Sequence, residues 1–417
     1  MSITVKPAKN SHPVTVEVPS SKSYLNRALI IAALTETPVR LNNVSEFDDS
    51  RAMIDGLKTL GLQITQSEDS LVVENSIFDL PETNVIIDAN QSATTSRFLT
   101  ALCCLVPGEQ TITGHESLLS RPIEPLIVSL KLLGAEISRD DKNQIIIRSH
   151  KLESGSVEVD SKYSSQFLTS LLLIAPVAGF KVKSEQISTS SYIEITKDIM
   201  HSFGVSVSTE DSEFSVQPQQ YSAAEYTIEP DYSSASYFWA LAALSGRSIK
   251  VLNTSKNTKQ GDVKILDILE QFGAEVRLQS DGIEVLGGEI NPVKADMSQL
   301  PDQAQTIAVI TAFAAGESSL TGLDTLRHKE TDRIDATCNE LEKLGIETEP
   351  GEGSMIIYGA EPQSATVDTY MDHRMAMSFA LAGSRLEEGV TINNPDVVSK
   401  TFPEYWDKLK QVGLEIS

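Results

Sequence analysis

Several helix-like segments of the chain begin with cationic and hydroxyl side chains, a combination suited to binding phosphate or carboxylate groups. The segment SKSYLNRALIIAAL begins with Lys22 and Ser23, and Arg27 lies four residues after Ser23, on the same helix face. The first backbone N–H groups of a helix lack partners, and the helix dipole favours negative charge there. A cation and a hydroxyl group at such an end predict a site for an anionic small molecule.

The same arrangement recurs at the start of three further apolar helices. These starts carry Thr94 and Arg97; Ser164, Ser165 and Gln166; and Asp372, His373 and Arg374. For a single helix, ordinary capping and surface charge would explain such residues. Their recurrence on four equivalent helices of an acidic protein favours a shared anion site.

The segment RHKETDR adds a dense group of charges. We expect Lys329 and Arg333, four residues apart, to share one helix face with Glu330 beside them, although a solvated helix start is the alternative interpretation. Arg121 and Lys400 open two outer helices in a similar way. The sequence contains no P-loop, dinucleotide fingerprint, CxxC, HExxH or GxSxG motif. Catalysis is therefore expected from carboxylates, lysines and arginines acting on an anionic substrate.

Composition excludes several other classes of protein. The net charge of −24 predicts a poor binder of nucleic acid and of anionic membranes. No apolar run approaches the roughly 18 residues that a membrane helix needs, and we see no signal peptide. Three cysteines cannot build a disulfide framework, which fits a reducing cytoplasm, and six scattered histidines predict no metal site.

The elements that must position these residues form a six-fold internal repeat. A helix that ends in glycine and precedes a strand recurs every 68 to 73 residues, at Gly61, Gly134, Gly204, Gly273, Gly345 and Gly413. Helices that are apolar almost all round recur in phase, and we expect them to be buried. Their expected N-caps are Ser21, Ser92, Ser164, Ser233, Asp302 and Asp372.

Six repeats of this length are too many for one core, so the sequence predicts an α/β fold with two lobes of three repeats each. We expect the first lobe at residues 19–228. The second lobe would combine residues 229–417 with residues 1–18, whose strand completes it. An open solenoid is the alternative, but the buried helices favour compact lobes.

At these residues the chain resembles the EPSP synthase (3-phosphoshikimate 1-carboxyvinyltransferase) family of enolpyruvyl transferases. The resemblance covers nearly the full length and rests on SKSYLNRAL, TTSRFLTAL, RPIEPL, SSQFLTSLL, EPDYSSASYF, QGD, LPDQAQTIAV, KETDR, DHRMAMSFAL and KTFPEYW. It implies a two-lobed, inside-out α/β barrel of six βαβαββ repeats. It also implies transfer of the enolpyruvyl group of phosphoenolpyruvate to the 5-hydroxyl of shikimate 3-phosphate, in the shikimate pathway. The enzyme would be a cytoplasmic monomer that needs no cofactor.

The resemblance further implies roles for individual residues. Shikimate 3-phosphate would contact Lys22, Ser23, Arg27, Ser164, Ser165, Gln166, Thr189, Tyr192, Asp302, Thr325 and Lys329. Phosphoenolpyruvate would contact Lys22, Ala93, Thr94, Arg121, Gln166, Arg333, His373, Arg374 and Lys400. Asp302 would accept the hydroxyl proton, Glu330 would protonate the methylene carbon, and Lys22 would serve both substrates. Because both lobes contribute, we expect the substrates in the cleft between them, drawing the lobes together.

Four features depart from the family pattern without removing a charged catalytic group. Ser20 stands for a glycine, Thr189 for a serine and Thr325 for an asparagine, and the opening of residues 90–94 lacks two glycines. One of these glycines is replaced by Ala93. Its methyl group would crowd the inhibitor glyphosate, which is longer than phosphoenolpyruvate, so we expect reduced glyphosate sensitivity.

Three other functions were weighed against this one. The first is UDP-N-acetylglucosamine enolpyruvyl transferase, which has a cysteine proton donor and a Lys-Asn pair where this chain has Lys22 and Ser23. The second is a relative acting on another cyclic alcohol. The third is a silent anion-binding protein, which would not need Asp302 and Glu330.

Overall fold

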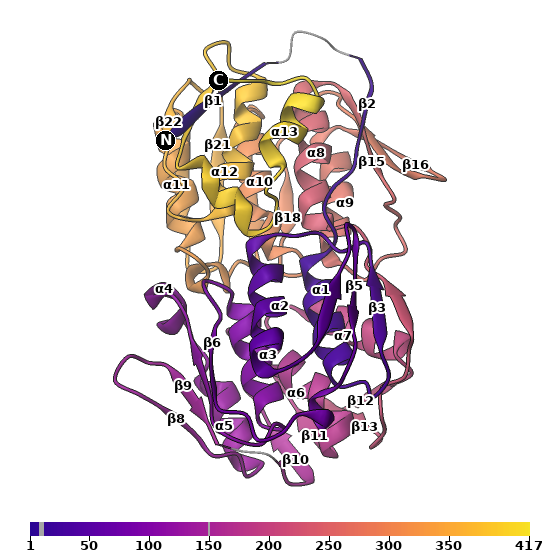
Figure 1. Ribbon diagram of the computed structural model, residues 1–417. Helices are drawn as coiled ribbons and strands as arrows, with labels where there is room; N and C mark the ends of the chain where they lie inside the picture. The colour runs from indigo at the N-terminus through magenta and orange to yellow at the C-terminus, as the bar shows by residue number, and fades with distance from the viewer. Residues whose placement is uncertain (8–11, 149–150) are drawn as a thin grey trace. The chain divides into compact units, whose positions relative to one another are not determined.

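Six four-stranded sheets, one for each repeat, form the framework of the computed structural model, which describes residues 1–7, 12–148 and 151–417 (Figure 1). One repeat shows the pattern: β10 (Gly155–Glu158), α6 (Gln166–Ala178), β11 (Phe180–Lys183), α7 (Ser190–Ser202), β12 (Val207–Glu210) and β13 (Glu213–Val216). The sheet order is β10-β11-β13-β12, with the first pair parallel and the others antiparallel. The parallel pair requires a crossover, which α6 supplies.

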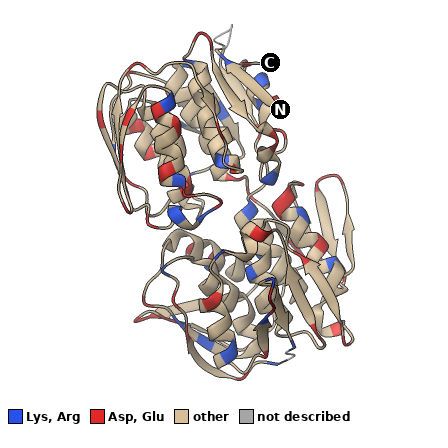
Figure 2. Ribbon diagram, turned by 90° about the vertical axis from the view of Figure 1, so that its left-hand side faces the viewer, with Lys and Arg blue, Asp and Glu red and all other residues tan. Residues whose placement is uncertain are grey.

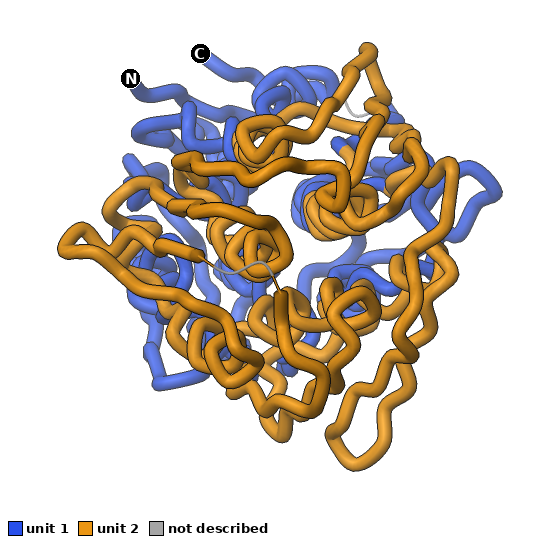
Figure 3. The backbone as a smooth tube through the Cα atoms, turned by 60° about the horizontal axis from the view of Figure 1, so that its bottom comes forward, with its two compact units in different colours: residues 1–19, 230–417 blue, residues 20–229 orange. Residues whose placement is uncertain are grey.

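Residues 20–229 form one of two compact units (Figure 3). Its other strands are β3 (Val39–Asn42), β4 (Ile64–Gln66), β5 (Ser70–Val73), β6 (Val85–Asp88), β7 (Gln110–Thr113), β8 (Ile137–Arg139), β9 (Ile145–Ile147) and β14 (Glu225–Thr227). Its other helices are α1 (Lys22–Ala33), α2 (Asp48–Leu60), α3 (Ala93–Cys103), α4 (Glu116–Leu119) and α5 (Glu124–Leu132), with a short 3₁₀ turn η1 (Ile77–Asp79).

Residues 1–19 and 230–417 form the second unit. Its strands are β1 (Ser2–Lys6), β2 (Val14–Val16), β15 (Ser248–Leu252), β16 (Glu275–Gln279), β17 (Gly282–Leu286), β18 (Lys294–Asp296), β19 (Gly316–Thr321), β20 (Glu347–Pro350), β21 (Met355–Gly359), β22 (Thr366–Val367), β23 (Val390–Asn393) and β24 (Glu415–Ile416). Its helices are α8 (Tyr232–Ser245), α9 (Ile265–Phe272), α10 (Ala304–Thr311), α11 (Arg333–Lys343), α12 (His373–Ala380) and α13 (Tyr405–Gln411). Its 3₁₀ turns are η2 (Gly261–Lys264), η3 (Pro301–Gln303), η4 (Leu326–His328), η5 (Leu381–Ser384) and η6 (Pro395–Lys400).

Two strands are exchanged between the repeats at the unit boundaries. β14 directly precedes α8 in the chain, yet it pairs with β3. β2 precedes α1, yet it pairs with β15. β1 pairs with both β23 and β24, so the N-terminal strands complete sheets of residues 230–417.

The apolar helices are buried, as their sequences predict. All residues of α1 from Tyr24 to Ala33 are buried, and α8 is buried over nearly its whole length. In residues 20–229, α3 contacts both α1 and α6, and in the second unit α10 contacts α8 and α12. Each unit therefore has its own apolar core, built on three central helices.

The predicted helix ends are confirmed. The glycines at positions 61, 134, 204, 273, 345 and 413 all have a positive φ, between 80° and 115°. An L-residue with a side chain adopts this left-handed region only at a cost, whereas glycine reaches it readily.

The predicted helix starts are confirmed at only three of six helices. The side chains of Ser21, Ser92 and Asp372 cap α1, α3 and α12. The cap of α6 is Ser165 instead of Ser164, and α8 is capped by Asp231 instead of Ser233. Asp302 is not a cap, because Pro301 begins the 3₁₀ turn η3 before α10.

Acidic residues are spread over both units, as Figure 2 shows. Within the described residues, no helix is long and apolar enough to cross a bilayer.

Candidate active site

A buried network of charges surrounds Arg333 at the start of α11. The guanidinium donates from Nε to Oδ2 of Asp372 at 2.7 Å and from Nη2 to Oδ1 of the same carboxylate at 3.2 Å. It also donates to Oδ1 of Asp302 at 3.0 Å and to Oε2 of Glu330 at 2.8 Å. Burial lowers the pKa of Arg333, but these three carboxylates outweigh it and the pKa is raised. Arg333 therefore holds both proposed acid–base carboxylates in one place.

Three further cations complete this network. Nζ of Lys329 lies 3.2 Å from Oδ1 of Asp302, and Nη2 of Arg374 lies 3.1 Å from Oδ2 of the same residue. Nζ of Lys400 lies 2.7 Å from Oε1 of Glu330. With Arg333 and Asp372, the network has four cations and three carboxylates, so its excess charge is positive.

The local chain conformation explains this geometry and corrects one expectation. Lys329 and Arg333 do not share a helix face, because Lys329 ends the 3₁₀ turn η4 and α11 begins only at Arg333. Asp332 caps α11 by accepting from the backbone N–H groups of Ile334 and Asp335. The non-helical stretch between them allows Lys329 and Arg333 to approach Asp302 from two directions.

The loop before α12 is held in an unusual conformation. Tyr370 and Met371 are consecutive residues with positive φ, 53° and 57°. The hydroxyl of Tyr370 donates to Oε1 of the buried Glu340 at 2.7 Å, which anchors the loop to α11. The next residue, Asp372, is thereby placed to cap α12 and to hold Arg333. Strained backbone of this kind concentrates at functional sites.

A second group of predicted residues lies in the unit of residues 20–229. Nζ of Lys22 lies 3.0 Å from Oδ2 of Asp49, which is 6% exposed on the first turn of α2. Arg27 is buried, and its guanidinium donates only to neutral groups in the described chain: the hydroxyls of Thr196 and Thr169 and two backbone carbonyls. Burial lowers the pKa of Arg27 to about 10. A buried cation without a carboxylate partner is suited to an anionic ligand.

Arg97 joins the starts of α3 and α6 to the loop that carries Arg121. Its Nη1 donates to Oγ of Ser164 at 3.1 Å and to Oε1 of Gln166 at 2.7 Å. Its Nη2 donates to the carbonyl of Pro122 at 2.7 Å. Nε2 of Gln166 donates to Oγ1 of Thr94 at 3.1 Å, so the predicted residues of both helices meet.

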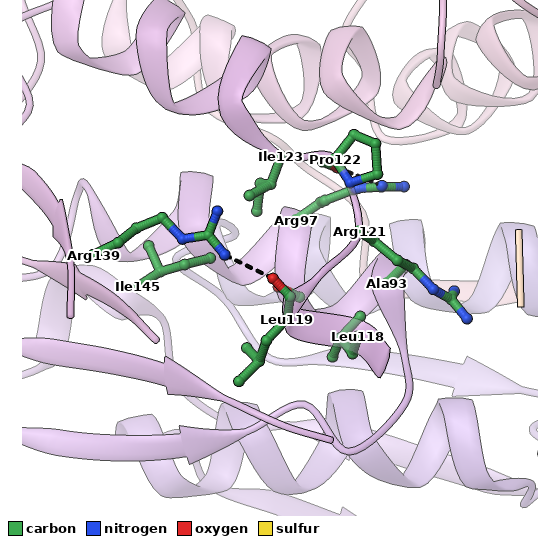
Figure 4. Close-up of a pocket in the computed structure, with 10 residues that line it drawn as sticks. Ala93, Arg97, Leu118, Leu119, Arg121, Pro122, Ile123, Arg139 and Ile145 are labelled. Atoms are coloured by element: carbon green, nitrogen blue, oxygen red, sulfur yellow. Dashed lines mark hydrogen bonds between the residues drawn. The ribbon is translucent and has the colours of Figure 1, made fainter. Parts of the chain in front are cut away.

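Ala93 and Arg121 line one small pocket, together with Arg97 and Arg139 (Figure 4). Arg139, on β8, donates to the carbonyl of Leu119 at 2.7 Å and to Oε1 of Glu124 at 2.7 Å. These bonds fix the loop on both sides of Arg121. Arg121 and Pro122 lie before α5, which begins at Glu124.

The remaining predicted residues have simpler surroundings. The backbone carbonyls of Ser23 and Tyr192 accept from Arg27. Thr189 is the buried N-cap of α7, and Thr325, before η4, is buried with no hydrogen-bond partner for its hydroxyl. Nδ1 of the buried His373 lies 3.5 Å from Oδ1 of Asp372.

Asp49 and the part that Asp372 plays beside Arg333 were missed by the sequence reasoning. Asp49 lies on a different helix from Lys22, and Asp372 reads as an ordinary cap. No spacing in the sequence signals either contact. Within residues 1–7, 12–148 and 151–417, no three His, Cys, Asp or Glu side chains are grouped to hold a metal ion.

Comparison with known proteins places this geometry in a family. The model of the EPSP synthase (3-phosphoshikimate 1-carboxyvinyltransferase) family matches residues 9–409. The 3-phosphoshikimate 1-carboxyvinyltransferase of Vibrio campbellii is 40% identical over 99% of both chains, and that of Aliivibrio salmonicida is 39% identical over 96% of both.

Solved structures share the fold. An EPSP synthase from Acinetobacter baumannii superposes with a TM-score of 0.83 at 23% identity, covering 100% of this chain and 99% of the other. The enolpyruvyl transferase NikO from Streptomyces tendae gives 0.80 at 15% identity, covering 100% and 98%. The predicted fold class of mixed α/β repeats is confirmed, and the chain belongs to the EPSP synthase family.

Proposed function

We propose that the protein transfers the enolpyruvyl group of phosphoenolpyruvate to the 5-hydroxyl of shikimate 3-phosphate, releasing phosphate. The observation that carries this proposal is the network around Arg333, in which Asp302 and Glu330 share one guanidinium. This enolpyruvyl transfer needs one group to take a proton from oxygen and another to give a proton to carbon. Two carboxylates among four cations suit both that task and the binding of a trianionic substrate.

Asp302 is the proposed base of the addition step. Contacts with Lys329, Arg333 and Arg374 favour its ionised form, which is the form that accepts a proton. The substrate hydroxyl loses its proton to Asp302 as its oxygen bonds to C2 of phosphoenolpyruvate. At the same time C3 gains a proton, and a tetrahedral ketal phosphate results.

Glu330 is the proposed proton donor to C3. In the ligand-free arrangement, Lys400 and Arg333 favour its ionised form. The carboxylate and phosphate of phosphoenolpyruvate would compete for these two cations. Their hold on Glu330 would weaken, and its protonated form would become accessible. In the second step C3 loses a proton, the C2–O bond to phosphate breaks, and phosphate leaves.

Shikimate 3-phosphate would bind mainly through residues 20–229. Arg27 offers a buried charge without a carboxylate partner, and Ser164, Ser165 and Gln166 offer polar groups at the start of α6 for the 3-phosphate. Lys22 would serve both substrates, because breaking its contact with Asp49 frees its charge. Both units thus contribute binding residues to the proposed reaction, which we place in the cytoplasm and in a monomer.

The test is a phosphate-release assay with phosphoenolpyruvate and three acceptors: shikimate 3-phosphate, UDP-N-acetylglucosamine and no acceptor. We expect release only with shikimate 3-phosphate. Asp302→Asn should abolish it, whereas Asp267→Asn, an exposed carboxylate on α9, should not. Release with UDP-N-acetylglucosamine alone, or with no acceptor at all, would contradict the proposal.

A further inference from the structure

Asp262 is a buried carboxylate outside the network around Arg333, in the QGD motif to which no role has yet been assigned. It lies on η2, after β15, and is 4% exposed. Its Oδ1 accepts from Oγ of Ser233 at 2.9 Å and from Nε2 of Gln303 at 2.5 Å. No lysine or arginine of the described chain forms an ion pair with it. A carboxylate buried in this way is costly to keep, so its two neutral partners deserve examination.

Both partners of Asp262 lead directly to proposed substrate-binding residues. Oγ of Ser233 accepts from Nη2 of Arg374 at 3.4 Å. Gln303 follows Asp302 in the 3₁₀ turn η3, and its other amide atom, Oε1, accepts from Ser236. Asp262 is therefore one hydrogen bond away from the arginine and from the turn that carries the base.

The chemistry of these groups fixes their direction. A hydroxyl has one hydrogen, and Ser233 donates it to Asp262, so its lone pairs are left to face Arg374. An ionised Asp262 cannot donate, so Gln303 must present its NH₂ group to it and its carbonyl to Ser236. Burial raises the pKa of Asp262, and the positive charge of Arg374 opposes this shift.

We infer that Asp262 is a positioning residue for phosphoenolpyruvate binding: through Ser233 it orients Arg374, and through Gln303 it fixes the turn that carries Asp302. Without Asp262, the Ser233 hydroxyl can turn its hydrogen toward the guanidinium. The orientation of Arg374 then becomes less favourable for a bidentate contact with a carboxylate or phosphate. This inference rests on the proposed role of Arg374 in binding phosphoenolpyruvate.

The first experiment measures the KM of both substrates for Asp262→Ala and Asp262→Asn. We expect Asp262→Ala to raise the KM for phosphoenolpyruvate about tenfold, and that for shikimate 3-phosphate much less. Asn retains an acceptor for Ser233 and Gln303, and the other carboxylate oxygen of Asp262 has no printed donor that an NH₂ group would oppose. Asp262→Asn should therefore restore the KM to within about threefold of the wild type. Equal KM values in the Ala variant and the wild type would overturn the inference, as would an Asn variant as poor as Ala.

A double-mutant cycle tests the path through Ser233. If Asp262 acts through Ser233, the double variant Ser233→Ala/Asp262→Ala should raise the KM for phosphoenolpyruvate by less than the product of the single effects. Multiplying effects would refute the path. Should Asp262→Ala fail to fold, Ser233→Ala decides alone: a raised KM at an unchanged melting temperature supports the inference, and an unchanged KM overturns it.

Two controls separate this inference from the proposed function. Asp267→Ala removes an exposed carboxylate of α9 whose partner, Lys256, is also exposed, and should leave both KM values unchanged. Arg374→Ala should raise the KM for phosphoenolpyruvate by more than Asp262→Ala does. If Arg374→Ala has no effect, the proposed site is wrong. If only the Asp262 and Ser233 variants have no effect, the site stands and the positioning role fails.

Discussion

Asp372 performs two tasks whose energies can be separated by substitution. It holds Arg333 through two hydrogen bonds, with both side chains at most 2% exposed, and it caps α12 by accepting from the backbone N–H of Arg374 at 2.9 Å. At a charge separation of about 4 Å, such a pair is worth about 4 kcal/mol at an effective dielectric constant near 20. Breaking a buried pair typically costs about 3–5 kcal/mol.

Asp302 and Glu330 still hold Arg333 when Asp372 is changed, so we expect the low end of that range. Asp372→Asn removes the charge but remains a good cap, and should reduce the free energy of unfolding by about 3 kcal/mol. Asp372→Ala also removes the cap and should lose about 1 kcal/mol more.

Urea unfolding followed by tryptophan fluorescence measures these losses. Both tryptophans, Trp239 and Trp406, lie in the same unit as Asp372, so their signal reports on that unit. With a slope of about 2 kcal/mol/M, the Asn variant should unfold about 1.5 M earlier in urea. A midpoint within about 0.3 M of the wild type would refute the reasoning, because the pair would then contribute little. Equal midpoints for the Asn and Ala variants would show that the cap contributes nothing.

Four further outcomes are expected. Ala93→Gly should bind glyphosate about ten- to a hundredfold more tightly in competition with phosphoenolpyruvate, because it removes a crowding methyl group worth about 1–3 kcal/mol; an unchanged inhibition constant would exclude steric crowding at this position. Glu330→Gln should abolish turnover yet leave shikimate 3-phosphate binding nearly intact by calorimetry, whereas Lys22→Ala should weaken it; equal losses would make Glu330 a binding residue. Met371→Asn should raise the free energy of unfolding by about 0.5–1 kcal/mol, since Asn tolerates a positive φ better than Met, and a loss of stability would show that the present contacts of Met371 outweigh the strain. Saturating shikimate 3-phosphate should reduce the radius of gyration in small-angle scattering, and an identical radius with and without ligand would argue against closure.

The repeat and its helix ends were predictable because they depend on local chemistry. Glycine at each helix end is required by a left-handed backbone, whatever the rest of the chain does. The apolar helices are likewise identified by composition alone. Ser164 and Ser233 failed as caps because a neighbouring residue, Ser165 or Asp231, begins the helix instead, and a shift of one or two residues leaves no trace in the pattern.

The network around Arg333 was predicted in membership but not in geometry. The resemblance supplied Asp302, Glu330, Arg374 and Lys400, and the structure brings all four together with Arg333. The regular spacing of Lys329 and Arg333 suggested one helix, yet the 3₁₀ turn ends at Lys329. Partners such as Asp49 and Asp262 lie on elements remote in sequence from the residues they contact, so only tertiary packing reveals them.

The exchange of β2 and β14 has a consequence for the order of folding during synthesis. Residues 20–229 are contiguous, so this unit has all its strands once β14 has emerged from the ribosome. The other unit cannot finish until the end of translation, because β1 must pair with β24 at residues 415–416. Its N-terminal strands wait unpaired while some 400 residues are made, a delay of at least about 20 s at 5–20 residues per second. A chain truncated by only three residues would lose the last strand of that sheet, so the C-terminus acts as a checkpoint for complete synthesis.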